Sequence, residues 1–362
     1  MRHTVSVFLS ILVTFSFLLA GCAAQPVVRA VEQEPPTPSP ENMVHLRIGV
    51  LPIGAFTPFF VAQEKGYFTE QGLAVEFETF RTGAEMIAPL SLGQIDVGGG
   101  EAGTALFNAI AQGLDLKVVL SLSTLTETNS YFLMVARKDL VDSGEIKTMA
   151  DLRERKIGIN NQHGMTEYFA AQALKTGDLT VDDVQLVILP FPEMVQALAN
   201  KALDVAYLQH PLAATALNPG PDGQTPMAVE LYSFYHINPE IQCASVLFGK
   251  NLLDPKNEDV GARLTVALLK AARDMQGDAW RSDEQIVRVI SERTGVPEAV
   301  VRKSVMPGHD PDGTISWANL ETMQSYYLER GYPEYTEPLP EEQVVEERFQ
   351  QLAVERLGAY QP

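Results

Sequence analysis

The feature that most constrains the fold of this chain is a regular alternation of two kinds of segment from His45 onward. Short runs of β-branched and aliphatic residues alternate with longer segments whose apolar residues recur at helical spacing. Such alternation, with only a few residues between segments, is typical of α/β folds. It occurs in two successive series, residues 44–130 and 131–243, so the sequence predicts two α/β lobes.

These runs predict individual elements. We expect strands at 45–52, 73–80, 95–100, 116–123, 131–139, 156–161, 184–190, 203–210 and 228–235. We expect helices at 58–72, 83–94, 103–113, 148–156, 164–177 and 192–202. The fourth of these helices opens with Thr148-x-x-Asp151, which is the pattern of a capping box.

After residue 243 the pattern changes to amphipathic helices only. They are expected at 259–280, 282–295, 297–305, 317–331 and 341–358. Their apolar stripes are explained most simply as core contacts. We therefore expect residues 244–362 to form a helical segment that packs back on the first lobe.

The N-terminus indicates export and lipidation. Arg2 precedes an apolar run from Val5 to Leu19, which is long enough for a secretory signal but short for a spanning helix. Leu19-Ala20-Gly21-Cys22 follows and resembles a bacterial lipobox. We expect residues 1–21 to be a signal peptide and Cys22 to carry the lipid anchor, with 22–43 as a flexible linker. The alternative is an uncleaved signal anchor with a chance cysteine.

Charge and cysteine content narrow the partners. The net charge is −19, and it becomes −20 without residues 1–21, whose one charged residue is Arg2. Such an acidic chain repels nucleic acid, so no nucleic-acid partner is expected. With Cys22 acylated, Cys243 is the remaining thiol and no internal disulfide is possible. No segment after the signal is apolar enough to span a bilayer.

Several motifs together resemble a known family. They are VAQEKGYFTEQGLAVEF at 61–77, the stretch 93–119 with GQIDVGGG, KIGINN at 156–161 with Thr166, and LDVAYLQHP at 203–211. Over roughly residues 45–245 the chain resembles the NMT1/THI5-like and SsuA-like solute-binding proteins of ABC importers. The resemblance implies a bilobal, type II-like periplasmic-binding-protein fold that closes on its ligand by hinge motion. It also implies a membrane permease as partner, a location at the extracytoplasmic face of the cell membrane, and no catalysis.

A glycine motif offers a competing interpretation. Gly98-x-Gly100-x-x-Gly103 matches the dinucleotide fingerprint and lies between a predicted strand and helix. That fingerprint also needs an acidic residue at the end of the next strand. The next strand ends in Ser123, although Glu127 follows shortly. We therefore expect backbone amides at this helix N-terminus to face the cleft, and no dinucleotide cofactor.

Histidines raise the question of a metal site. His163, His210 and His236 each fall in a predicted loop of the second lobe, so a three-histidine site is conceivable. They lack the tight spacing of known metal motifs, and scattered histidines are more often ordinary loop residues. The chain also lacks a Gly-x-Ser-x-Gly elbow. We expect neither a metal nor hydrolase chemistry.

The ligand site is expected where strands end, because ligands of open α/β sheets bind at the carboxyl ends of strands. The loops there contain no Lys or Arg, and only Arg81 borders one. They contain aromatic rings suited to stacking, and carboxylates and amides suited to a ligand rich in N–H and O–H groups. The candidate ligand-binding residues are Phe56, Phe59, Glu85, Gly100, Glu101, Thr104, Glu127, Asn160, Thr166, Tyr168, Tyr207, Gln209 and Tyr235.

The family resemblance then limits the ligands. Within the family these include sulfonates, nitrate, pyrimidine precursors of thiamine, and riboflavin. Aromatic, cation-free strand ends favour a neutral heterocycle, so we rank riboflavin first, a formylaminopyrimidine second and an aliphatic sulfonate third. A rival of another class is the THI5-like enzyme that makes pyrimidine from its own histidine. A third alternative is an extracellular sensor or adhesion module with the same fold.

Overall fold

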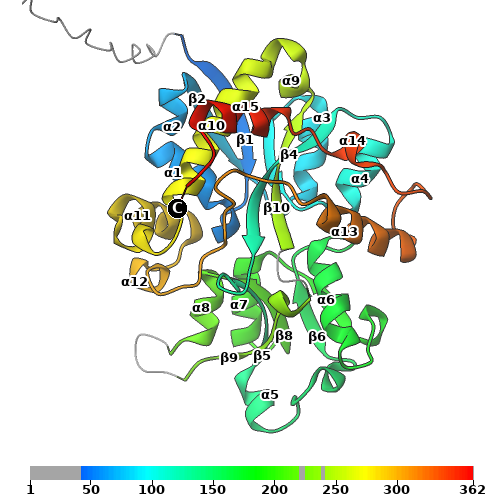
Figure 1. The fold of residues 1–362 in the computed structure, drawn as a ribbon. Helices are drawn as coiled ribbons and strands as arrows, with labels where there is room; N and C mark the ends of the chain where they lie inside the picture. The colour runs from blue at the N-terminus through cyan, green and yellow to red at the C-terminus, as the bar shows by residue number, and fades with distance from the viewer. Residues whose placement is uncertain (1–41, 220–224, 238–240, 362) are drawn as a thin grey trace, which may run out of the picture. The chain divides into compact units, whose positions relative to one another are not determined.

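Two five-stranded sheets form the framework of the chain (Figure 1). The structure is a computed structural model and describes residues 42–219, 225–237 and 241–361, within a compact unit that spans 37–362. The first sheet has the order β2-β1-β3-β10-β4, and the second β7-β6-β8-β5-β9. We call each sheet with its covering helices a lobe. The predicted signal peptide, Cys22 and most of the linker lie outside the described residues.

The strands of the first sheet are β1 (Val44–Val50), β2 (Leu73–Thr79), β3 (Val97–Gly100), β4 (Leu116–Leu125) and β10 (Ile241–Gly249). Those of the second are β5 (Phe132–Arg137), β6 (Lys156–Ile159), β7 (Gln185–Ile188), β8 (Val205–Gln209) and β9 (Ala228–Ser233). In each sheet four strands run in the same direction, and the fourth strand in the order, β10 or β5, runs antiparallel to both of its neighbours.

The chain passes between the two sheets twice. It leaves the first sheet at the end of β4 and enters the second at β5, and it returns from β9 to β10. Strand β10, which is buried along its whole length, was not predicted from the sequence. All of its residues are buried between β3 and β4, and its sequence, which includes the polar residues Gln242 and Ser245, lacks the two-residue alternation of a half-exposed strand. The expected helical segment from 244 therefore begins inside a strand.

Helices cover both sheets. In the first lobe they are α1 (Thr57–Glu64), α2 (Tyr67–Glu70), α3 (Ile87–Leu92) and α4 (Thr104–Ala111). In the second they are α5 (Lys138–Asp142), α6 (Met165–Lys175), α7 (Phe191–Ala199) and α8 (Leu212–Leu217). The single helix predicted at 58–72 is broken at Gly66, whose φ of 76° is left-handed. The predicted capping box of Thr148 and Asp151 is present, on the short 3-10 helix Met149–Leu152.

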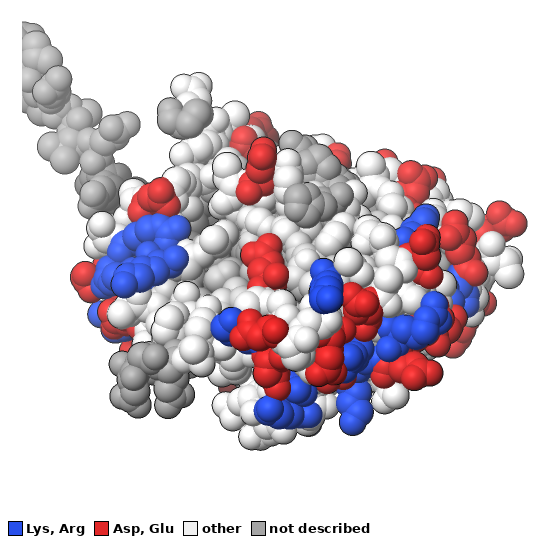
Figure 2. Space-filling model, turned by 90° about the horizontal axis from the view of Figure 1, so that it is seen from below, with Lys and Arg blue, Asp and Glu red and all other residues white. Residues whose placement is uncertain are grey.

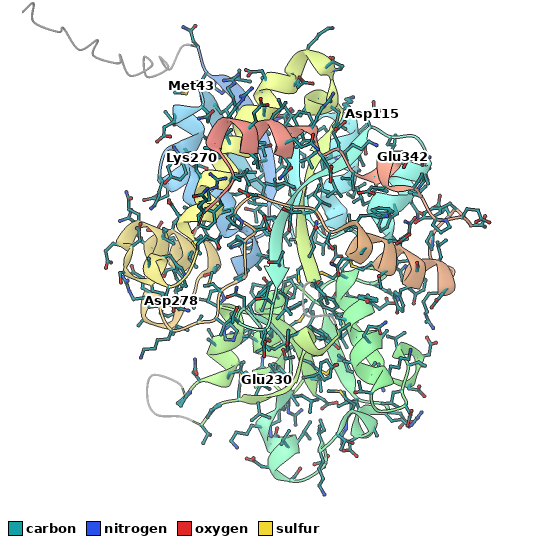
Figure 3. The ribbon with its side chains drawn as sticks, in the orientation of Figure 1. Met43, Asp115, Glu230, Lys270, Asp278 and Glu342 are labelled. Carbon is teal, nitrogen blue, oxygen red and sulfur yellow. The ribbon has the colours of Figure 1, made fainter. Side chains whose placement is uncertain are left out.

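The C-terminal helices pack on the first lobe, as predicted. They are α9 (Lys250–Leu253), α10 (Glu258–Asp274), α11 (Glu284–Thr294), α12 (Glu298–Val301), α13 (Trp317–Glu329), α14 (Glu341–Val344) and α15 (Arg348–Leu357). Helix α10 contacts α1, α2 and α15, while α13 contacts α4 and β10 but also α6 of the second lobe. In Figure 3, Lys270 on α10 and Glu342 on α14 lie in the first lobe, and Glu230 lies in the second.

The helix predicted at 341–358 is interrupted for a visible reason. Val345 forms a parallel bridge with Val118 of β4, and the backbone amide of Glu346 donates to the Val118 carbonyl over 2.9 Å. This pairing needs extended backbone, so α14 ends before it and α15 begins after it. Among the described residues, no helix is both long and apolar enough to cross a bilayer.

Candidate functional site

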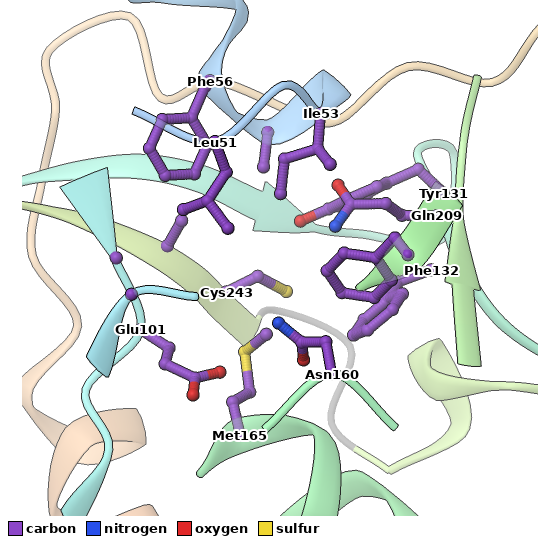
Figure 4. A pocket seen from close by; sticks show the side chains of 15 residues that line it. Leu51, Ile53, Phe56, Glu101, Tyr131, Phe132, Asn160, Met165, Gln209 and Cys243 are labelled. Atoms are coloured by element: carbon purple, nitrogen blue, oxygen red, sulfur yellow. The ribbon is translucent and has the colours of Figure 1, made fainter. Parts of the chain in front are cut away.

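A cavity lies where the two lobes meet (Figure 4). It contains about 430 Å³ of empty space, a volume that includes the part open to solvent. Both sheets supply lining residues, from the ends of β1, β3 and β8 and from the beginnings of β5 and β10. The lining residues are Leu51, Ile53, Ala55, Phe56, Gly83, Gly100, Glu101, Tyr131, Phe132, Asn160, Met165, Phe191, Gln209, Cys243 and Ala244.

On the first lobe, the glycine run of β3 shapes the cavity wall. A Cβ added to Gly99 would overlap the ring of Phe56, and one added to Gly98 would lie 2.8 Å from the Leu90 side chain. Glycine is therefore needed here for packing: it lets Phe56 lie against the strand with only 2% of its surface exposed. Packing thus accounts for Gly98 of the Gly98-x-Gly100-x-x-Gly103 pattern, whereas a Cβ at Gly100 or Gly103 would meet only ordinary van der Waals contacts.

On the second lobe, two amide side chains reach the cavity. Asn160 follows β6, and its Oδ1 accepts a hydrogen bond from the Thr166 hydroxyl over 2.9 Å. That bond fixes the amide so that its nitrogen is directed into the cavity (Figure 4). Gln209 ends β8 and is 4% exposed, and its Oε1 is buried without a hydrogen bond from any described residue.

Glu101 supplies a carboxyl group at the cavity floor. Its Oε1 accepts a hydrogen bond from Asn161 Nδ2, so the carboxyl links the two lobes. Burial raises the pKa of Glu101, because desolvation disfavours the charged form. The hydrogen bonds from Asn161 and from the Met165 backbone act in the opposite direction and offset part of that rise.

Tyr131 and Cys243 are inert lining groups. Tyr131 Oη lies 3.1 Å from Ser123 Oγ, at hydrogen-bonding distance. Burial raises the pKa of the Cys243 thiol to about 12, while Tyr131 acts in the opposite direction. The thiol therefore stays protonated at neutral pH and is a poor nucleophile.

The lobes touch around the cavity. The backbone amide of Thr104, at the first residue of α4, donates to the His163 carbonyl over 3.1 Å. Gly54 approaches the second lobe so closely that a Cβ there would lie 2.5 Å from the His210 carbonyl oxygen. Arg81 pairs with Glu193 of α7 at 3.4 Å. The amide that we expected to face a ligand at the start of α4 is thus used between the lobes.

The C-terminal segment adds contacts to the second lobe near α13. Arg330 donates two hydrogen bonds of 2.9 Å to Asp182. The rings of Tyr332 and His163 are stacked with centroids 4.0 Å apart. Tyr326 Oη donates to Glu167 over 3.4 Å. These contacts hold the second lobe against a segment that packs on the first.

Five of the thirteen candidate residues line this cavity: Phe56, Gly100, Glu101, Asn160 and Gln209. Thr166 lies behind Asn160 and orients it through the hydroxyl bond already described. That these residues contact a ligand stays a prediction.

The other candidates lie elsewhere. Phe59 is in the first-lobe core, 6.1 Å from the Phe56 ring. Tyr207 is fully buried and stacks on Phe234 at 5.0 Å. Tyr168 packs edge-on against Tyr326 at 5.4 Å. Their rings serve core packing, so we do not include them in the proposed site.

Four further candidates are also outside the cavity lining. Thr104 is buried at the start of α4, where its backbone amide joins the lobes. Glu85 is exposed and accepts a hydrogen bond from the Arg81 backbone amide, 3.0 Å away. Glu127 is exposed in the connection between β4 and β5, and its carboxylate raises the pKa of Tyr235, although burial raises it more.

The cavity lining has a distinctive charge. Among the described lining residues Glu101 is the one charged group, and none of them is Lys, Arg or His. His210 lies beside the cavity rather than in its lining, and burial lowers the pKa of its imidazole to about 4. The described residues hold no group of three or more His, Cys, Asp or Glu placed to bind a metal.

Sequence comparison places the chain among known proteins. Residues 39–283, about two thirds of the chain, match the NMT1-like family. The chain belongs to the NMT1-like family. A protein of Brucella abortus named as a binding protein is 25% identical over 217 residues, covering 60% of this chain and 61% of that protein. A riboflavin-binding protein of Chloroflexus aurantiacus is 24% identical over 201 residues, covering 51% and 52%.

Solved structures share the fold. The nitrate-binding protein NrtA of Synechocystis superposes with a TM-score of 0.71 at 14% identity, covering 87% of this chain and 89% of that one. The aliphatic sulphonate-binding protein SsuA of Escherichia coli gives 0.65 at 19% identity, covering 85% and 93%. At such identities the likeness shows the fold alone. The match over residues 39–283 confirms the family predicted from the sequence. The solved structures confirm the predicted bilobal periplasmic-binding-protein fold.

Proposed function

We propose that this chain is the solute-binding subunit of an ABC importer and captures a small neutral heterocycle for delivery to a membrane permease. The observation that carries the proposal is the cavity between the lobes. Four aromatic rings and two amides line it, and none of the described lining residues is cationic. Rings suit stacking on a planar ligand, and amides suit a ligand with both donors and acceptors.

Riboflavin is the first ligand that we propose, and a formylaminopyrimidine the second. The match to a riboflavin-binding protein supports the first, although it covers only about half of each chain. An aliphatic sulfonate ranks third. A sulfonate or nitrate ion brings negative charge beside Glu101, and the lining residues that the structure describes include no cation to balance it. The net charge of −19 also steers anions away.

We further propose that the chain works outside the cytoplasm, anchored through acylated Cys22, and that the two crossings between the sheets form its hinge. We expect no nucleic-acid partner, because a net charge of −19 repels nucleic acid. On the face shown in Figure 2, Lys and Arg side chains are interspersed with Asp and Glu, unlike the continuous basic surface of nucleic-acid-binding proteins.

Ligand titration tests the proposal. The purified chain should bind one riboflavin per molecule, quench its fluorescence and release it unchanged, with little dependence on salt. At ligand concentrations a hundredfold above Kd, unfolding should cost about 2.7 kcal/mol more. Tight binding of taurine or nitrate with no binding of either heterocycle would refute the neutral-ligand assignment. Ligand turnover or dependence on added iron would favour the THI5-like enzyme instead.

A further inference from the structure

The side-chain oxygen of Gln209 is buried and accepts no hydrogen bond from any described residue. Gln209 is also one of the residues that line the cavity. Leaving a buried acceptor unpaired is unfavourable, and the usual remedy is a donor from a ligand or ordered water. The backbone of Gln209 is fixed by pairing with Phe132 in β5, so the side chain starts from a rigid position.

Asn160 offers the cavity a hydrogen-bond donor, whereas Gln209 offers an acceptor. Its oxygen is occupied by the Thr166 hydroxyl, so the amide nitrogen is left to donate into the cavity. Figure 4 shows Gln209 and Asn160 entering the cavity from different sides, with the Phe132 ring near both. An aromatic surface next to one free acceptor and one free donor suits a flat ligand with a polar edge.

We infer that the cleft recognises the cyclic amide or imide edge of its heterocycle, and that Gln209 is the specificity residue. Gln209 Oε1 accepts a hydrogen bond from the ligand N–H, and Asn160 Nδ2 donates to a ligand carbonyl. This inference rests on the proposed function and names the ligand class more narrowly. Sulfonates and nitrate carry acceptors but no N–H donor, so they leave Gln209 Oε1 unpaired.

A methylated probe tests the inference on the unaltered protein. Riboflavin carries one imide N–H, and 3-methylriboflavin lacks it while keeping the ring and the polyhydroxyl chain. The full chain should bind the methylated compound roughly 5- to 150-fold more weakly, because a buried acceptor then stays unpaired. Equal affinity for the two compounds overturns the inference and leaves the proposed function in place.

Variants assign the effect to Gln209. Gln209→Met should bind riboflavin more weakly by a similar factor and should no longer distinguish riboflavin from its methylated form. Gln196→Met, the same change at an exposed position of α7, should behave like the unaltered chain. If methylation instead weakens binding to Gln209→Met by the same factor as binding to the unaltered chain, Gln209 does not accept a hydrogen bond from that N–H.

Other probes separate failure of the inference from failure of the proposed function. If the chain binds uracil but not riboflavin, the same comparison is made with 3-methyluracil. Binding of a formylaminopyrimidine without binding of any cyclic imide overturns the inference alone. Binding of taurine with no binding of riboflavin, uracil or formylaminopyrimidine overturns both.

Discussion

The backbone amide of Thr104 donates a hydrogen bond to the carbonyl oxygen of His163 over 3.1 Å, and so joins the two lobes at the rim of the cavity. The bond between Asn161 and Glu101 lies close by and joins them again. Both bonds must break if the lobes separate here, so their strength sets part of the cost of opening.

The first prediction concerns the pH dependence of stability at Glu101. Its folded-state pKa is raised above the ordinary 4.5, so the folded chain holds this proton more tightly than the unfolded chain. The stabilisation of the folded chain by the protonated Glu101 is therefore fully present below pH 4.5, and it is lost as the pH rises through the raised pKa. Across that window the free energy of unfolding should fall by at most about 1.4 kcal/mol per pH unit on this account.

Glu101→Gln isolates that effect. The variant should be more stable than the unaltered chain above the window, and its advantage should shrink as the pH falls to 4.5. Urea unfolding at several pH values measures the difference. Glu78→Gln, the same change on an exposed face of β2, is the control. If the difference in unfolding free energy between Glu101→Gln and the unaltered chain does not change with pH, then the pKa of the Glu101 carboxyl is the same in the folded and unfolded chains.

The second prediction concerns Arg330, whose two bonds to Asp182 help to hold the second lobe closed. The guanidinium lowers the pKa of Asp182, but the pair is partly exposed, so its net value is about 0.2–1 kcal/mol. Arg330→Gln should therefore weaken ligand binding by roughly 1.4- to 5-fold, because less of the free protein is closed. It should also increase the radius of gyration of the unliganded chain in solution scattering.

The control is Arg153→Gln, which removes a similar ion pair with Asp183 inside the second lobe. This change does not touch the contact between the lobes, so affinity and radius should stay unchanged. Equal effects of the two substitutions would argue against a closing role for Arg330.

The third prediction concerns the hydroxyl of Tyr207. It is fully buried and receives no hydrogen bond from the described residues. Tyr207→Phe should therefore raise the free energy of unfolding by about 1 kcal/mol and leave riboflavin affinity unchanged. Tyr131→Phe is the matched comparison, because that hydroxyl lies 3.1 Å from Ser123 Oγ, and its loss should destabilise by a similar amount. A large loss of affinity in Tyr207→Phe would return Tyr207 to the ligand site.

The fold was predictable because local patterns agreed with tertiary structure. Strands such as β1 and β6 are short segments with valine or isoleucine among their buried residues. The capping box at Thr148 marks its helix correctly. What could not be predicted depends on partners distant in sequence. Val345 bridges Val118 and breaks a helix that its own sequence favours. Strand β10 is recognisable only once β3 and β4 are known to flank it.

The site was predictable in part for a related reason. Reading the carboxyl ends of strands assumes that the strands are parallel, and that assumption identified Phe56, Glu101, Asn160 and Gln209 as candidates that line the cavity. Strands β5 and β10 are antiparallel, so their beginnings face the cleft instead. Tyr131, Phe132, Cys243 and Ala244 were missed on that account. The buried rings of Phe59 and Tyr207 were included because sequence does not reveal which face of an element a ring occupies.

The last prediction concerns the anchor, which lies outside the described residues. If Cys22 is acylated, the chain should sediment with membranes, because each buried acyl methylene contributes about 0.8 kcal/mol. Cys22→Ser should move the protein to the soluble or secreted fraction. Cys243→Ser is the matched control: that thiol is buried at the cavity, so its replacement should leave the membrane fraction unchanged. A Cys22→Ser chain that stays with membranes at the level of the unaltered protein would contradict the lipoprotein hypothesis. The solute-binding proposal would survive that result, because it depends on the cavity and the family rather than on the anchor.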